Sequence, residues 1–174
     1  MRDAESAADP EHELASYFAK YKPALAELGR ELRAKLRKRL PGLNEIVYVY
    51  ENQGSLVISY SPTDKGYEAL CSLALAPSGA KLCFAQGPAL AKLDPHKLLK
   101  GSGKLVRHVE LQAAADFDSA ELQALFAAAL KLANVRLASE AKGALILKAE
   151  SQRRRAKAAK RPVAAKPTPK KPRR

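Results

Sequence analysis

Residues 84–111 read FAQGPALAKLDPHKLLKGSGKLVRHVEL and lie at the centre of the fold that the sequence predicts. This stretch indicates the end of a strand, a short helix opened by Asp94-Pro95, a Gly-Ser-Gly turn and a new strand from about Lys104. A glycine-bearing, cationic loop held by apolar neighbours suits an anion. The alternative interpretation is a tight connection whose charges face water. The candidate anion-binding residues are Lys100, Gly101, Gly103, Lys104, Arg107 and His108.

In the chain before this stretch, apolar residues begin to recur with a period of two, which is typical of strands. Residues 46–50, 56–60, 67–75 and 81–85 predict four strands joined by short turns, an antiparallel meander. A fifth strand is expected from Leu105 to Leu111. The fold class is therefore predicted as α+β, with an antiparallel β-sheet of about five strands and helices packed on one face.

The flanking segments predict the helices. Asp9-Pro10 begins one that runs to about Lys20. Leucines recur every three or four residues from Leu25 to Leu40, and the other face of that helix is basic. Cations toward the end of a helix suit its dipole, so a solvated face accounts for them. Asp116 or Asp118 caps a helix from about Ser119 to Asn134, and residues 138–159 are also helical in character.

The charge is concentrated at one end of the sequence. The formal net charge is +13, and eleven Lys or Arg with no acid lie in residues 153–174. The first 152 residues keep 20 bases against 18 acids. The sequence predicts a disordered N-terminus over 1–8, an α+β domain over 9–137, a helical extension over 138–159 and a disordered basic tail over 160–174.

Several functional classes lack support in the sequence. No apolar run approaches the ~20 residues of a membrane span, and the first residues lack the apolar stretch of a signal peptide. Cys71 and Cys83 fit a reducing compartment, so we expect a cytoplasmic protein with buried thiols; the alternative is a pair of thiols that neighbour one another across two strands. His12, His96 and His108 lack ligand spacing. No metal ligands, cofactor motif or Ser/His/Asp arrangement is predicted.

The segment DPHKLLKGSGKLVRHVEL, together with the LPGLNEIVYVYENQGSLVISY strands before it, resembles the YdhG-like domain of unknown function. The resemblance covers about residues 9–133. It implies an antiparallel sheet with helices on one side, similar to frataxin, and one branch of the family is regarded as an iron chaperone. The signature positions are Asp94, Pro95, Leu98, Leu99, Gly101, Gly103, Lys104, Arg107 and His108.

The basic tail gives the leading functional prediction, because clustered Lys and Arg bind phosphates without any defined structure. We expect a non-catalytic cytoplasmic binding module that associates non-specifically with nucleic acid and does not bind membranes. The alternatives are a frataxin-like iron or metal chaperone, and an enzyme acting on an anionic small substrate. The predicted nucleic-acid-binding residues are Arg153, Arg154, Arg155, Lys157, Lys160, Arg161, Lys166, Lys170, Lys171, Arg173 and Arg174.

Overall fold

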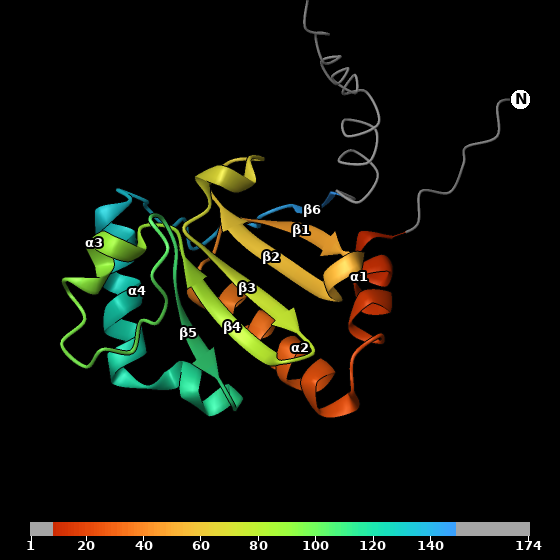
Figure 1. Cartoon of the computed structure of the whole chain (residues 1–174). Coiled ribbons are helices and arrows are strands. Elements are labelled where there is room, and N and C mark those ends of the chain that lie inside the picture. Colours follow the sequence, from red (N-terminus) through yellow and green to blue (C-terminus); the bar gives the residue numbers. More distant parts are fainter. Residues whose placement is uncertain (1–8, 149–174) are drawn as a thin grey trace, which may run out of the picture.

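Within residues 9–148, six strands form one mixed β-sheet in the order β5-β4-β3-β2-β1-β6 (Figure 1). The structure is a computed structural model, and it describes residues 9–148. Neighbouring strands from β5 to β1 are antiparallel, whereas β6 runs parallel to β1. The fold is α+β. The strands are β1 (Asn44–Tyr50), β2 (Ser55–Ser61), β3 (Cys71–Ala76), β4 (Gly79–Phe84), β5 (Arg107–Leu111) and β6 (Leu145–Lys148).

Helices bury their apolar stripes on one face of this sheet. In Figure 1, α2 and α4 lie behind the strands, and α1 packs against α2 and β6. The strands alternate as the period of two requires, so that Ile58, Leu73 and Leu82 are fully buried against the helices. The helices are α1 (Pro10–Phe18), α2 (Pro23–Arg39), α3 (Gly87–Ala91) and α4 (Ala120–Leu132), with short 3₁₀ turns η1 (Glu51–Gln53), η2 (Gly66–Glu68) and η3 (Ala114–Asp118).

Gly29 lets α2 approach the rest of the core. A Cβ atom at this position would lie 2.5 Å from Leu75 Cδ1 and 2.8 Å from Phe18 Cε1. Glycine weakens a helix interior by roughly 1 kcal/mol relative to alanine. Its presence in the middle of α2 is therefore explained by the close contact between α2, α1 and β3.

The helix expected to begin at Asp94-Pro95 is absent, and the helix of this region is α3, seven residues earlier. The side chain of Asp94 is buried, and its carboxylate accepts a hydrogen bond from the Leu99 backbone N–H at 2.8 Å. The Asp-Pro pair therefore closes a turn rather than opening a helix. The third strand is also shorter than predicted, because residues 66–68 form η2 and pairing starts at Cys71.

The prediction of a helix over residues 138–159 is wrong for its described part. Residues 138–144 form a loop, and 145–148 form β6. The apolar run Leu145-Ile146-Leu147 pairs with β1, where tertiary pairing overrides local helix propensity. Asn44 fixes the register, because its Oδ1 accepts from the Ala144 N–H at 2.8 Å. The sheet is thus mixed and six-stranded, rather than antiparallel with five strands.

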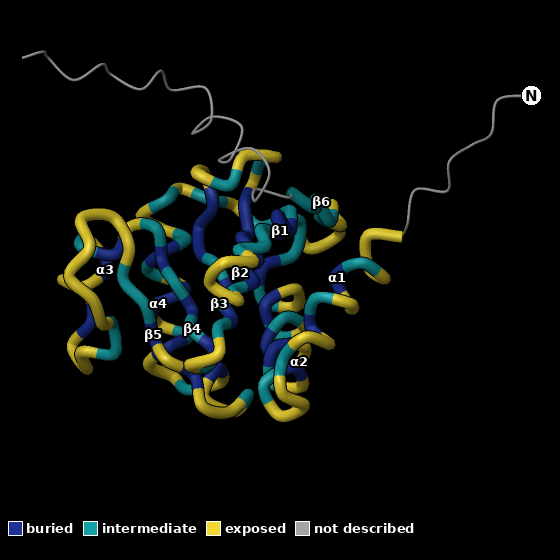
Figure 2. Tube along the Cα trace, turned by 45° about the vertical axis from the view of Figure 1, so that its right-hand side comes forward, coloured by how far each residue is buried: buried dark blue, intermediate teal, exposed yellow. Residues whose placement is uncertain are grey.

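The predictions for residues 1–8 and 149–174, including disorder and all the nucleic-acid-binding residues, lie outside the described part of the chain. Figure 2 shows the buried central strands and the largely exposed loop that follows α3. None of the helices within residues 9–148 has the length and apolar character that a membrane span needs.

Candidate functional site

The loop between α3 and β5 is fastened to the sheet at the predicted anion site. The Lys100 N–H donates to the His108 carbonyl at 2.7 Å, and the His108 N–H donates to the Lys100 carbonyl at 3.0 Å. Gly101 follows at a φ of +101°, a conformation that side chains other than glycine rarely adopt. We call the Gly-Ser-Gly turn with these two backbone hydrogen bonds the clip, and it holds Lys100 beside β5.

The cations around this clip point to different partners. Lys100 Nζ lies 2.7 Å from Glu110 Oε2. The Arg107 guanidinium donates to the backbone carbonyls of Gly103 and Val106. Lys104 alone among these three makes no hydrogen bond or ion pair with the described residues. The loop therefore does not gather its charges at one point, and an anion site here stays a prediction.

His108 lies on the sheet face opposite the core. Its pKa is lowered, first by burial and then by the charge of Lys81, so the imidazole is neutral at physiological pH. Cys83 is its cross-strand neighbour. Burial raises the pKa of the Cys83 thiol, which keeps it protonated and poorly nucleophilic.

The two cysteines do not form a pair. Cys71 pairs with Phe84 and Ser72 pairs with Cys83, so the two thiols lie on adjacent strands but on opposite faces of the sheet. His12 and His96 are exposed and belong to separate elements. Within residues 9–148, no group of three or more His, Cys, Asp or Glu is placed to hold a metal ion.

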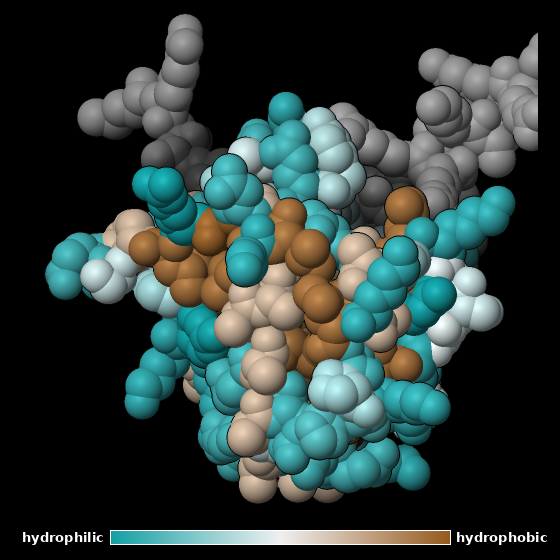
Figure 3. Space-filling model, turned by 90° about the vertical axis from the view of Figure 1, so that its left-hand side faces the viewer, coloured by the Kyte–Doolittle hydropathy of each residue, from teal (hydrophilic) through white to brown (hydrophobic). Residues whose placement is uncertain are grey.

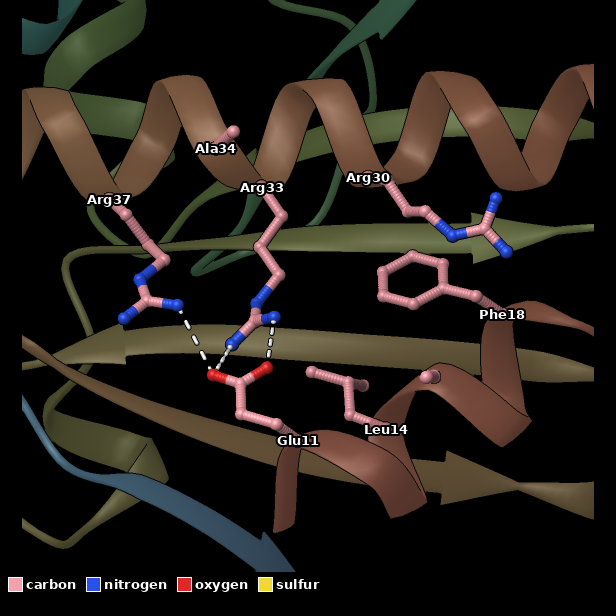
Figure 4. Close-up of a pocket in the computed structure, with 8 residues that line it drawn as sticks. Glu11, Leu14, Phe18, Arg30, Arg33, Ala34 and Arg37 are labelled. Carbon is pink, nitrogen blue, oxygen red and sulfur yellow. Dashed lines mark hydrogen bonds and ion pairs between the residues drawn. The ribbon is translucent and has the colours of Figure 1, made fainter. Parts of the chain in front are cut away.

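A cluster of charged side chains joins α1, α2 and β1, and Figure 4 shows the part of it that lies between α1 and α2. Arg33 lies between two carboxylates, with Nη1 and Nη2 at 2.7 and 2.8 Å from Glu11, and Nε and Nη2 at 2.9 and 2.6 Å from Glu45. Arg37 adds a bond to Glu11 at 3.2 Å. The hydrogen bond from Arg33 lowers the pKa of Glu11. Arginines of α2 therefore hold a carboxylate by two-point contacts.

Further cations extend along the outer side of α2. We define the basic face of α2 as Arg30, Lys35, Arg37 and Lys38. Arg30 pairs loosely with Glu27 at 3.4 Å, and its guanidinium lies over the Phe18 ring, 5.8 Å from the centroid. Lys35 pairs with Asp118 of η3, whereas Lys38 has no partner among the described residues. Two of the four cations are thus held only weakly or not at all.

Two hollows flank α2, one on each side of this face. The first, of about 490 Å³, lies between α1 and α2 and contains Arg30, Arg33 and Arg37 together with Glu11. The second, of about 500 Å³, lies between α2 and η3 and contains Lys35, Lys38 and Arg39. Both are open at the surface, and each combines basic side chains with an apolar floor.

Sequence reasoning interpreted these cations as a solvated helix face. The run RAKLRKR over residues 33–39 was a visible signal. The pairing of Arg33 with Glu11 and Glu45 could not be predicted, because those residues are 22 and 12 positions away from Arg33 along the chain.

Comparison of the chain with family models, with curated proteins and with solved structures finds no match. Function is therefore inferred from the geometry of the described residues and from the sequence.

Proposed function

We propose that the protein is a non-catalytic binding module for polyanions, with nucleic acid as its target. The basic face of α2 would act together with the basic segment over residues 153–174. The observation that carries the proposal is the row of cations along one helix, of which Lys38 has no ionic partner among the described residues and Arg30 only an exposed one.

The spread of these cations favours a polyanion over a small anion. Arg30 and Lys38 are eight residues apart, which is about 12 Å along a helix axis. That length matches three to four steps of a nucleic-acid strand, at about 3.4 Å a step. Arg30, Ala34 and Lys38 lie on one side of the helix because residues four apart are neighbours there. Ala34, which lies between the two cations, lines both hollows.

The proposed binding is independent of the nucleic-acid sequence. Contacts from exposed Lys and Arg to phosphates position a protein on nucleic acid but carry no sequence information. The affinity should therefore depend strongly on salt and weakly on sequence. Membership of the YdhG-like family, a frataxin-like arrangement, an iron-chaperone role and an enzymatic role stay predictions from the sequence.

The test compares two variants with equal reductions in charge. The first replaces three cations of the basic face, Arg30→Gln/Arg37→Gln/Lys38→Gln. The control replaces Lys92, Lys97 and Lys131 with Gln; all three are exposed, and they lie at the end of α3, in the loop after it and in the last turn of α4. Binding to a fluorescent DNA duplex is measured by anisotropy over a range of salt concentrations.

We expect the α2 variant to bind more weakly than the control and to reduce the slope of log affinity against log salt by about 0.9 for each phosphate that it no longer neutralises. Circular dichroism melts establish that both variants are folded. An α2 variant that binds DNA as tightly as the control, with the same slope, would show that the basic face takes no part.

A further inference from the structure

An apolar hollow at the ends of β3 and β4 is a separate feature of the surface. We define the apolar groove as the hollow of about 630 Å³ whose rim includes Tyr67, Leu105 and Val106 and whose walls include Leu70, Phe84 and Val135. It lies between η2, the β3 start, the β4 end and the residues after α4. No residue of α2 lines it, so it is distinct from the basic face.

The rim of the apolar groove exposes large apolar side chains. Tyr67 is 80% exposed, Leu105 74% and Val106 47%. Single exposed apolar residues are ordinary, but a gathered patch marks an interaction surface. Figure 3 faces this side of the molecule and shows hydrophobic side chains collected there, with hydrophilic ones around them.

Hydrogen bonds to backbone carbonyls hold the loop that carries Leu105 and Val106. The Gly87 N–H donates to the Leu105 carbonyl at 2.9 Å, and the Arg107 guanidinium donates to the Val106 carbonyl at 3.3 Å. Gly87 itself permits this approach, because a Cβ there would lie 2.3 Å from the Arg107 backbone nitrogen. The exposure of these side chains is therefore built into the fold, and little ordering is needed when a partner binds.

No Lys or Arg lines the apolar groove itself, but the charged residues next to its lining in the sequence are mostly positive. Lys104 and Arg107 flank the exposed Leu105-Val106 pair, and Arg136 follows the wall residue Val135. The single acid of the lining, Glu68, is paired with Lys65 at 3.7 Å, so these two charges cancel. The surface therefore complements a partner that combines negative charge with large apolar side chains.

The ends of this chain do not have that chemistry. Residues 153–174 carry eleven positive charges and no acid, which would repel the basic rim. Residues 1–8 contain Asp3 and Glu5, but Met1 is their only large apolar side chain.

We propose that the apolar groove docks an acidic segment of another protein, which inserts one or two large apolar side chains between Tyr67 and Leu105. The basic rim orients the segment through Lys104, Arg107 and Arg136. Together with the basic face of α2, the groove would make this protein an adaptor with two separate binding surfaces.

The experiment selects binders for the full chain from a display library of random dodecapeptides. The selected peptides are synthesised, and their affinities are measured by calorimetry for the parent and three variants. Leu105→Ser removes a rim side chain, and Lys104→Glu reverses a rim charge. Leu93→Ser is the matched control, because Leu93 is also an exposed leucine, at 53%, but does not line the groove.

We expect enrichment of Asp and Glu beside Leu, Ile, Phe or Trp. Leu105→Ser and Lys104→Glu should each weaken binding about tenfold or more, whereas Leu93→Ser should leave it unchanged. Selected peptides without acidic bias, no enrichment at all, or equal binding to Leu105→Ser would overturn the proposal. Light scattering that shows a dimer abolished by Leu105→Ser, or binding to phosphatidylserine vesicles that needs Leu105, would overturn it in favour of a second copy or a lipid surface.

Discussion

Removing Arg33 should lower the free energy of unfolding more than removing the Glu45 carboxylate that it contacts. The Glu45 side chain is only 6% exposed, and that of Arg33 is 13% exposed. Arg33→Met leaves the Glu45 carboxylate buried with the Tyr60 hydroxyl at 3.2 Å and Arg37 Nε at 3.9 Å. A buried charge without its partner destabilises a protein by about 3–5 kcal/mol. Glu45→Leu instead leaves Arg33 with both bonds to Glu11, and its main cost is the missing partner of Tyr60, about 1–3 kcal/mol.

The double variant gives the sharper test. Adding Glu45→Leu to Arg33→Met removes the isolated carboxylate, so the double variant should be more stable than Arg33→Met alone, by about 2 kcal/mol. Urea denaturation at pH 7, followed by circular dichroism, measures the free energy of unfolding of all four proteins. This reasoning would be refuted if the losses in free energy of unfolding of the two single variants added up in the double variant. It would also be refuted if Glu45→Leu lowered the free energy of unfolding more than Arg33→Met.

Three further predictions concern Glu11, the clip at Gly101 and the C-terminal segment. Arg33 lowers the pKa of Glu11 below its ordinary 4.5, so the stability that Glu11 contributes is present above about pH 4.5 and is lost as the pH falls through the lower folded value. Glu11→Gln should therefore make the melting temperature fall less steeply as the pH is lowered. An unchanged dependence of the melting temperature on acid pH would contradict this. Gly101→Ala should lower the free energy of unfolding by about 1 kcal/mol or more because of its positive φ, whereas Ser102→Ala should not, and equal urea midpoints for the two variants would show that the turn has no need of glycine. Deletion of residues 153–174 should remove about five to eight phosphate contacts from the salt dependence of duplex binding without moving the melting temperature, and an unchanged salt slope would assign the contacts to α2.

Much of the fold follows from local patterns in the sequence. The leucine stripe predicted α2, and Leu32 and Leu36 are fully buried. The alternation over residues 46–60 predicted β1 and β2, and Asp9 caps α1 as expected through a bond to the Glu11 N–H at 3.2 Å. In each case the signal lies within one element, where helix and strand periods are strongest.

The errors arise where a distant partner decides the conformation. The composition of residues 145–147 predicts a helix, but these residues form a strand because they pair with β1. Asp94-Pro95 has the composition of a helix start, but its carboxylate bonds five residues ahead to Leu99. Distant groups also decide where Lys100 and Arg107 point, because Glu110 binds the first and two backbone carbonyls accept from the second; the anion site itself stays a prediction.

The parallel pairing of β6 with β1 has a consequence for how the chain is made. Asn44 and Ala144, which set the register of this pair, are 100 residues apart, so the contact closes late in synthesis. Until residues 145–148 have left the ribosome, β1 presents an unpaired edge rich in valine and tyrosine, a template for pairing between nascent chains. Translation products that stop short of Leu145 should therefore aggregate. Once β6 has paired, it replaces the seven-residue edge of β1 with an edge of four residues, and short edge strands pair less readily with other copies of the chain.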